Sequence, residues 1–376
     1  MNNAYESIFT SFRFPSGVTA NNRITMAPMT LMASRSNGQV TDNELAYYNL
    51  RSRGTGTLFT SSALVSQSGK LAENGFGIDK DDLLPGLKKM ASVIRNNGTK
   101  AFVQLFHGGR LSTPAFLAGG QALSASAVAA EREGAAVPRA MTEAEIEAVI
   151  DDFAQATRRA IEAGFDGVEL HGANGFLLQQ FFSPHSNRRE DHWGGTLEKR
   201  MNFPLELIKR VKDTVAKHAA SPFAVGYRIS PEENENPGIT MADTLQFVEV
   251  LAAQGLDFIH VSVDRFWAGP RREEDKDNEK SRIVMIQERV GDRIPVIGVG
   301  GLWTPEDVVQ ALATGIPLVG LGHAMLLNPD WVEKVRNGRQ AEITTTLSRS
   351  SQKELMIPDV MWGMITNVPG WFNVVD

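Results

Sequence analysis

The chain of 376 residues contains no cysteine. This absence excludes disulfide bonds, catalytic thiolates and metals held by cysteine. Tyrosine is scarce, with four residues in the chain, so a phenolic proton donor has few candidate positions. No apolar run reaches the roughly 20 residues of a membrane-spanning helix, and residues 1–14 lack the apolar stretch of a secretory signal. We therefore expect a cytoplasmic protein without a membrane partner.

A strong charge of either sign is also missing. The formal net charge is −6 at pH 7, and the basic residues are scattered along the chain rather than gathered in a patch. Such a pattern predicts a small-molecule substrate rather than a nucleic-acid partner. The hydrophobic content of 42% is ample for one large core. No Pro/Ser-rich linker or low-complexity run divides the chain, so we expect a single domain over residues 1–376.

Short apolar runs alternate with amphipathic helical patterns along the chain, which is the rhythm of a parallel sheet. The expected strands are 23–27, 57–63, 101–105, 167–171, 223–229, 258–262, 295–298 and 318–320. The expected helices are 41–53, 84–96, 142–163, 197–218, 241–254, 280–289, 304–313 and 328–336. Eight such units predict an α/β fold of the (β/α)8 TIM-barrel type. No Gly-x-Gly-x-x-Gly follows the first strand, which argues against a Rossmann domain.

Local signals support several of these boundaries. Residues 142–145 form a capping box before the long helix, and Pro305 follows Thr304 at a helix start. Two segments are too long for simple connections. Residues 108–140 are predicted to form a hairpin or an extra cap over the C-terminal mouth of the barrel, and residues 264–278 a solvated charged loop. The tail from about residue 338 is expected to pack on the barrel or on a neighbouring subunit.

In a barrel of this kind the active site lies at the carboxyl ends of the strands. The last two expected strands end in glycine pairs, 300–301 and 320/322. Glycines leave backbone N–H groups accessible, and in many barrels this position binds phosphate. Ordinary turns would also use glycine, but two clusters on adjacent strands favour the phosphate interpretation.

Two polar residues, His171 and Asn174, follow the fourth strand. Imidazole and amide N–H groups are both neutral donors, so together they could stabilise negative charge developing on one oxygen atom. A purely structural role is the alternative for each of them taken singly.

Gln104 and Arg228 are predicted to point into the barrel from the third and fifth strands. A buried arginine needs a partner, and Glu169 is the strand-end carboxylate available for an ion pair. The functional alternative is that Arg228 faces an electron-rich ligand edge, such as the pyrimidine of a reduced flavin.

Several motifs together resemble segments of the Old Yellow Enzyme family. They are residues 23–30 (RITMAPMT), 103–110 (VQLFHGGR), 167–177 (GVELHGANGFL), 183–189 (SPHSNRR), 193–200 (WGGTLEKR) and 298–301 (GVGG). They occur in the order of that family, and the likeness runs from about residue 6 to residue 335. The resemblance implies a TIM barrel with non-covalent FMN, reduced by NADH or NADPH. It also implies ene-reductase activity, in which hydride passes through flavin N5 to activated C=C bonds of unsaturated carbonyl or nitro compounds by ping-pong turnover.

The resemblance also assigns roles by position. His171 and Asn174 would bind the substrate carbonyl as catalytic residues, and Phe176 would contact the substrate. The FMN would be bound by Ala27, Pro28, Met29, Thr30, Ala63, Gln104, Arg228, Gly300, Gly301, Gly322 and His323. No metal is expected.

Three departures from the family pattern matter. The family commonly has tyrosine where this chain has Phe176, and that tyrosine protonates the substrate. Because Tyr227 should point outward from its strand, the proton here would come slowly from water, or the physiological reaction would need no such acid. His323 stands where the family has arginine, which leaves phosphate binding weaker or shared with Arg265. No arginine follows Arg349, so the subgroup that lends a C-terminal arginine to its neighbour does not describe this chain.

Two other interpretations stay open at this point. One is a flavin-binding barrel with impaired or different turnover, as Phe176 suggests. The other is a metal-dependent barrel hydrolase, since His107, His171, His260 and His323 lie at or after strand ends. The sequence is compatible with a homo-oligomer and does not choose between NADH and NADPH.

Overall fold

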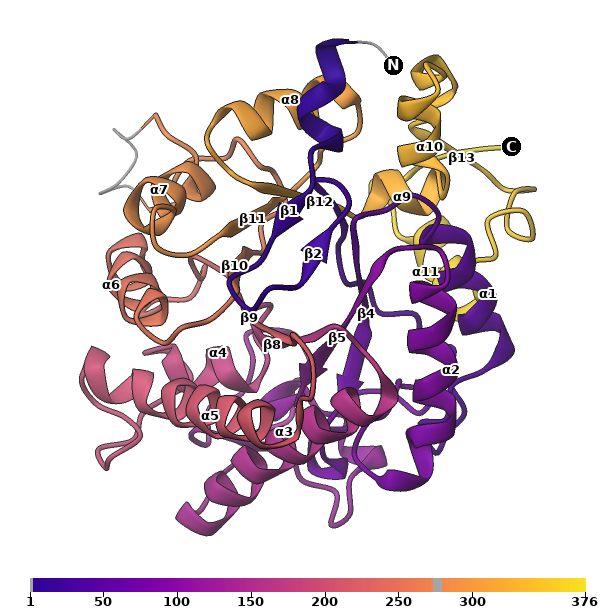
Figure 1. Ribbon diagram of the computed structural model, residues 1–376. Helices are drawn as coiled ribbons and strands as arrows, with labels where there is room; N and C mark the ends of the chain where they lie inside the picture. The colour runs from indigo at the N-terminus through magenta and orange to yellow at the C-terminus, as the bar shows by residue number, and fades with distance from the viewer. Residues whose placement is uncertain (1–2, 273–278) are drawn as a thin grey trace.

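The computed structural model describes residues 3–272 and 279–376. Its centre is a closed barrel of parallel strands in the order β10-β11-β12-β3-β4-β5-β8-β9 (Figure 1). The bounds are β3 (Ile24–Met26), β4 (Thr57–Leu64), β5 (Lys100–Phe106), β8 (Gly167–Gly172), β9 (Ala224–Ile229), β10 (Phe258–Val261), β11 (Val296–Val299) and β12 (Leu318–Leu321). Each corresponds to one of the eight expected strands, so the TIM-barrel prediction is confirmed.

Helices connect the strands and surround the barrel. They are α1 (Asp42–Arg51), α2 (Leu84–Arg95), α3 (Glu143–Ala163), α4 (Leu177–Phe182), α5 (Leu197–His218), α6 (Met241–Ala252), α7 (Arg282–Val290), α8 (Pro305–Ala313), α9 (His323–Leu327) and α10 (Trp331–Arg336). The expected start of α3 is confirmed, because Thr142 and Glu145 form a reciprocal capping box. At its end Gly164 adopts φ 85°, the left-handed conformation that glycine takes without strain.

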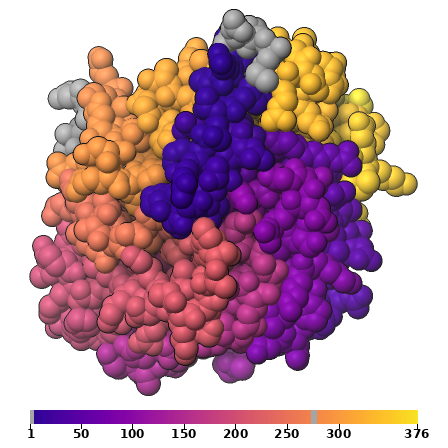
Figure 2. Space-filling view, viewed as in Figure 1, coloured from indigo at the N-terminus to yellow at the C-terminus, as the bar shows by residue number. Residues whose placement is uncertain are grey.

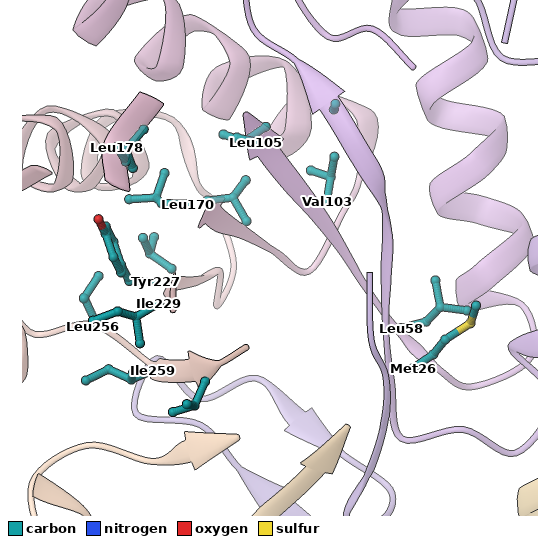
Figure 3. Close-up of a cluster of buried hydrophobic side chains, with 14 of the residues drawn as sticks. Met26, Leu58, Val103, Leu105, Leu170, Leu178, Tyr227, Ile229, Leu256 and Ile259 are labelled. Atoms are coloured by element: carbon teal, nitrogen blue, oxygen red, sulfur yellow. The ribbon is translucent and has the colours of Figure 1, made fainter. Parts of the chain in front are cut away.

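Alternate residues of each strand point outward and pack against the helices. Leu170, Tyr227 and Ile259 lie in this layer, where Figure 3 shows them among other buried apolar side chains. Tyr227 does point away from the barrel interior, since its ring lies 5.7 Å from that of Phe247 on α6. The inward positions are therefore left for a separate inner cluster and for polar groups.

The N-terminal end of the barrel is closed by an antiparallel hairpin of β1 (Phe12–Arg13) and β2 (Thr19–Ala20). In Figure 2 this segment covers the centre of the visible face. Phe14 packs beneath it on Phe102 and Phe258, with ring centroids 5.7 and 5.8 Å apart, and all three side chains are buried. The hairpin is too short to produce a detectable alternation in the sequence.

Residues 108–140 contain a parallel pair, β6 (Leu123–Ser124) with β7 (Arg139–Ala140), rather than a hairpin. The tail contains β13 (Thr346–Ser348), α11 (Asp359–Asn367) and β14 (Asn373–Val375), which the sequence did not predict. The expected charged loop lies partly outside the described residues. Among the helices that are described, none has both the length and the apolar character needed to cross a membrane.

Candidate active site

A cleft opens between the loops that follow β8, β9, β10 and β12, at the carboxyl ends of these strands. We call it the mouth cleft. Its lining includes Arg110, Asn174, Ser230, Ser262, His323 and Trp371. A smaller apolar pocket lies beside β3, β4 and α4, lined in part by Thr30, Ser62, Phe106 and Phe176. Residues predicted from the sequence to bind substrate or cofactor thus line both hollows.

His171 occupies the end of β8 and is 3% exposed. Its Nδ1 accepts a hydrogen bond of 3.4 Å from the backbone N–H of Ala173, so in the neutral ring the hydrogen belongs on Nε2. Burial, followed by the electrostatic effects of Arg228 and then His260, holds the pKa of His171 well below its usual value. His171 is therefore a neutral Nε2–H donor near pH 7.

Asn174 is held by two serines, which follow β9 and β10. Its Oδ1 accepts from Ser262 Oγ at 3.1 Å and from Ser230 Oγ at 3.4 Å, and its backbone N–H donates to Ser230 Oγ at 2.9 Å. Its φ of 57° is in the left-handed region that asparagine tolerates better than most residues. Because the amide oxygen is occupied, the amide N–H groups remain as donors on an exposed side chain.

A polar network fills the barrel below these donors. Gln104 Nε2 donates to Glu169 Oε1 at 2.6 Å, and Ser62 Oγ donates to Gln104 Oε1 at 2.6 Å. Glu169 Oε2 lies 2.7 Å from His260 Nδ1, and both side chains are fully buried. Burial outweighs the effect of Glu169 and lowers the pKa of His260, so the neutral ring donates from Nδ1. The carboxylate of Glu169 thereby fixes the orientation of the Gln104 amide and the His260 ring.

Arg228 is only loosely paired with that carboxylate, since Nη1 lies 4.0 Å from Glu169 Oε1. Its Nη2 donates to Ser262 Oγ at 3.2 Å. Its Nε is buried and, within the described part of the chain, has no hydrogen-bond partner. The ion pair considered from the sequence is thus present only at long distance, and Arg228 keeps a buried donor that a ligand could use.

The glycine turns lie at the ends of β11 and β12. Gly300 and Gly301 have φ of 144° and 59°, and a Cβ on Gly300 would come within 2.7 Å of the backbone nitrogen of Phe266. Glycine is required there by close backbone approach. Gly322 precedes α9, and a Cβ at that position would meet only Met29 Sδ, 3.7 Å away.

Residues 27–30 follow β3 directly. Ala27 and Ala63 are buried, whereas Pro28, Met29 and Thr30 are half-buried. Ala63 lies in the apolar layer outside the barrel, and its neighbour Ser62 supplies the side chain that reaches Gln104. A β-bulge between Phe59 and Ser62 sets this register, which periodicity alone does not reveal.

Phe176 caps α4 and packs its ring against His171 and Phe106, at centroid distances of 4.8 and 5.3 Å. The four tyrosines, all in described segments, have other surroundings. Tyr5 bonds to Glu306, Tyr48 to the backbone of Ser61, and Tyr47 and Tyr227 are buried. No phenolic hydroxyl therefore lines either hollow.

The four histidines considered as metal ligands each have separate surroundings. His107 lies 3.0 Å from Ser68 Oγ, His260 contacts Glu169, and His323 accepts from Trp371. Among the described residues, no group of three His, Cys, Asp or Glu side chains is placed to hold a metal ion.

Sequence reasoning missed Ser62, Ser230, Ser262 and Trp371. The two serines at 230 and 262 follow strand ends, so the position rule that found His171 would also have selected them. Trp371 had no such signal, because it approaches the mouth cleft from a tail whose path depends on tertiary contacts.

The barrel places these donors at the carboxyl ends of its strands, and comparison with known proteins identifies the family. The model of the NADH:flavin oxidoreductase / NADH oxidase family matches residues 7–342. The chain belongs to this family, which includes the Old Yellow Enzymes, and is an NAD(P)H-dependent flavin oxidoreductase.

Individual relatives agree with this assignment. The chain is 42% identical to a probable NADH-dependent flavin oxidoreductase, YqiG, of Bacillus subtilis (strain 168), over the full length of both. It is also 42% identical to an NADH:acrylate oxidoreductase of Vibrio harveyi over 93% of this chain, which spans 35% of that longer protein. The structure of an Old Yellow Enzyme homologue from Zymomonas mobilis has a TM-score of 0.77 at 25% identity, covering 90% of this chain and 94% of that one.

Proposed function

We propose that the protein is an FMN-dependent ene-reductase that takes electrons from NADH or NADPH and reduces activated C=C bonds by ping-pong turnover. The observation that carries this proposal is the pair of neutral donors, His171 Nε2–H and the Asn174 amide, after β8 and above the buried Arg228. Relatives named for acrylate and fumarate support an unsaturated acceptor.

The residues present fit FMN. Arg228 Nε is a buried donor without a partner in the described chain, and in the Gly300–Gly301 turn a Cβ on Gly300 would clash with the backbone of Phe266. Gln104 and Arg228 would hold the ring system, and Gly300, Gly301, Gly322 and His323 the phosphate, while Ala27 to Thr30 would line the ring; Ala63, in the outer layer, would not. When bound, FMN supplies the acceptor and donor of hydride equivalents.

The chain's own side chains then act on the substrate. His171 and Asn174 donate to the carbonyl oxygen and stabilise the negative charge that develops there as the β-carbon is reduced. Because the pKa of His171 is lowered, the ring stays a neutral donor rather than an acid. Phe176 has no proton to give, so the α-carbon proton comes from solvent.

A second function is favoured by Phe176 itself. A chain without a phenolic acid at this position suits an acceptor that needs no proton from the protein, such as dioxygen, to which the flavin would pass the two electrons taken from NADH. A relative from Thermoanaerobacter brockii, 35% identical over 87% of this chain, is named NADH oxidase.

The absorbance spectrum of the purified protein, followed anaerobically, tests these proposals. A flavin spectrum that bleaches with NADH or NADPH and recovers with an enone supports the ene-reductase. Bleaching that does not recover with an enone but recovers when air is admitted supports the second function, and failure to take up FMN contradicts both.

Phenol binding to the oxidised holoprotein tests the donor pair. We expect His171→Ala and Asn174→Ala each to weaken binding roughly 10- to 100-fold, as expected for a hydrogen bond to a charged oxygen. Unchanged affinity in both variants would refute the assignment.

A further inference from the structure

The tail of the chain lies beyond the residues that the family model matches, and it folds back onto the mouth of the barrel. The match ends at residue 342, whereas β13, α11 and β14 span residues 346–375. Arg51 Nη2 anchors this tail, because it donates both to the Leu355 carbonyl at 2.9 Å and to the Leu326 carbonyl of α9 at 3.0 Å. The buried side chains of Met361 and Ile365 attach α11 to the core.

This anchoring brings two aromatic residues onto His323. Trp371 Nε1 donates to His323 Nε2 at 3.1 Å, and the ring of Phe372 lies 4.5 Å from the imidazole. His323 and Trp371 line the same mouth cleft as Asn174 and Ser262. The tail therefore contributes directly to the site.

The direction of this hydrogen bond determines the tautomer of His323. An imidazole that accepts at Nε2 carries its hydrogen on Nδ1 when it is neutral. Burial also lowers the pKa of His323, which favours the neutral ring. His323 is thus left with one N–H donor of defined position, Nδ1–H.

We propose that Trp371 is a positioning residue of the cofactor-phosphate site. It holds His323 as the Nδ1–H tautomer, so that this donor and the backbone at Gly300, Gly301 and Gly322 bind the FMN phosphate. The inference rests on the proposed FMN function. It gives a physical reason why a histidine serves where the family resemblance led us to expect an arginine: the tail fixes a neutral donor in place of a charged one.

The test compares FMN with riboflavin, which differs from FMN by the phosphate. Dissociation constants for both are measured on apoprotein by quenching of flavin fluorescence. We expect Trp371→Phe, which keeps an aromatic ring but loses the N–H, to weaken FMN binding about three- to tenfold, the effect of one neutral hydrogen bond. Riboflavin binding should stay within about twofold. Trp362→Phe, in α11 of the same tail, is the matched control and should change neither constant.

A double-mutant cycle assigns the effect to His323. In a His323→Ala background, Trp371→Phe should cause no further loss of FMN affinity. An unchanged ratio of riboflavin to FMN constants in Trp371→Phe would overturn the proposal. Equal weakening of both ligands, or additive losses in the cycle, would also overturn it.

The tautomer can be read without any flavin, from the ¹⁵N chemical shifts of His323 in the apoprotein. We expect Nδ1–H in the wild type and a mixture in Trp371→Phe, whereas Nε2–H in the wild type would overturn the proposal. If wild-type protein binds neither flavin, the proposed function fails, and this spectrum still decides whether Trp371 fixes the tautomer.

Discussion

The two ends of this barrel are built by the same strands with opposite chemistry. On β5, Phe102 and Gln104 are two residues apart and both point inward, and on β10 the same is true of Phe258 and His260. Below this boundary the aromatic rings pack under a hairpin, while above it a carboxylate, an arginine and an imidazole share a network. The boundary itself is a contact between Phe59 and His260, whose ring centroids are 5.4 Å apart.

This difference suggests how stability and function are separated within one core. The cluster of aromatic rings at the N-terminal end is held by apolar contacts, so changes to these rings should act on folding. The polar end contains buried donors that cost stability unless they are paired, and such groups are typical of a binding site. Substitutions at each end can test whether the separation holds.

The largest expected effect is at the aromatic end. Phe258 is fully buried, with its ring 5.5 Å from that of Phe59 and 5.8 Å from those of Phe14 and Phe102. Phe258→Ala should lower the free energy of unfolding by about 3–5 kcal/mol through the cavity it leaves. Denaturant titration measures this, with the exposed Phe116→Ala as control. If Phe258→Ala, measured at 10 °C, loses as much free energy of FMN binding as free energy of unfolding, stability and function are not separated between the two ends.

A second effect, of about 2 kcal/mol, concerns pH and the polar end. Burial lowers the pKa of His107 to about 3, against about 6.5 in an unfolded chain. As the pH falls below 6.5, the unfolded state takes up a proton that the folded state refuses, so stability present above 6.5 is lost.

The measurement is the free energy of unfolding at pH 6.5 and at pH 4.5. Wild type should lose about 2 kcal/mol more than His107→Gln over this range. His218→Gln, at an exposed position, is the control and should behave as wild type. Equal losses in wild type and His107→Gln would show that His107 does not stay neutral.

A third effect compares two buried carboxylates at opposite ends of the barrel. Glu169→Gln removes a negative charge 4.0 Å from Arg228 and should raise the midpoint potential of bound FMN by about 30 mV, a tenfold change in a two-electron equilibrium. The reason is that the reduced cofactor carries more negative charge, which Arg228 then stabilises better. Potentiometric titration gives the value.

Asp257→Asn is the matched control. Asp257 is 5% exposed, accepts from the backbone N–H groups of Ser16 and Val225, and lies before β10 at the aromatic end. It should lower stability and leave the potential unchanged. Equal shifts of the potential in Glu169→Gln and Asp257→Asn would mean that the potential does not depend on the contact between Glu169 and Arg228.

The smallest effect is expected at Phe176. Phe176→Tyr places a hydroxyl near His171 and should raise the oxidative half-reaction rate with cyclohexenone a few-fold, below the usual 10²–10⁴ of general acid catalysis because solvent already supplies the proton. Stopped-flow spectroscopy measures the rate. An unaffected rate would mean that protonation does not limit turnover.

Much of the fold could be predicted because its signals are local. The apolar runs, the capping box at Thr142 and the glycine at 164 act within a few residues, and each marks an element boundary that the structure contains. The elements that were missed lack such signals. Helix α4 has six residues, all buried, so no polar face marks its period, and the strands of the N-terminal hairpin have two residues each.

The sequence by itself determined the barrel, the family and the identity of the residues at the strand ends, because periodicity and motif order are properties of neighbouring residues. Only the tertiary structure decided how these residues pair. Glu169 bonds to Gln104, 65 residues before it, and to His260, 91 residues after it. These pairs form because closure of the barrel brings β5 and β10 to the same carboxylate. Trp371 reaches His323 across 48 residues because the tail is anchored on Arg51. Such contacts depend on the path of the whole chain, and no local pattern encodes them.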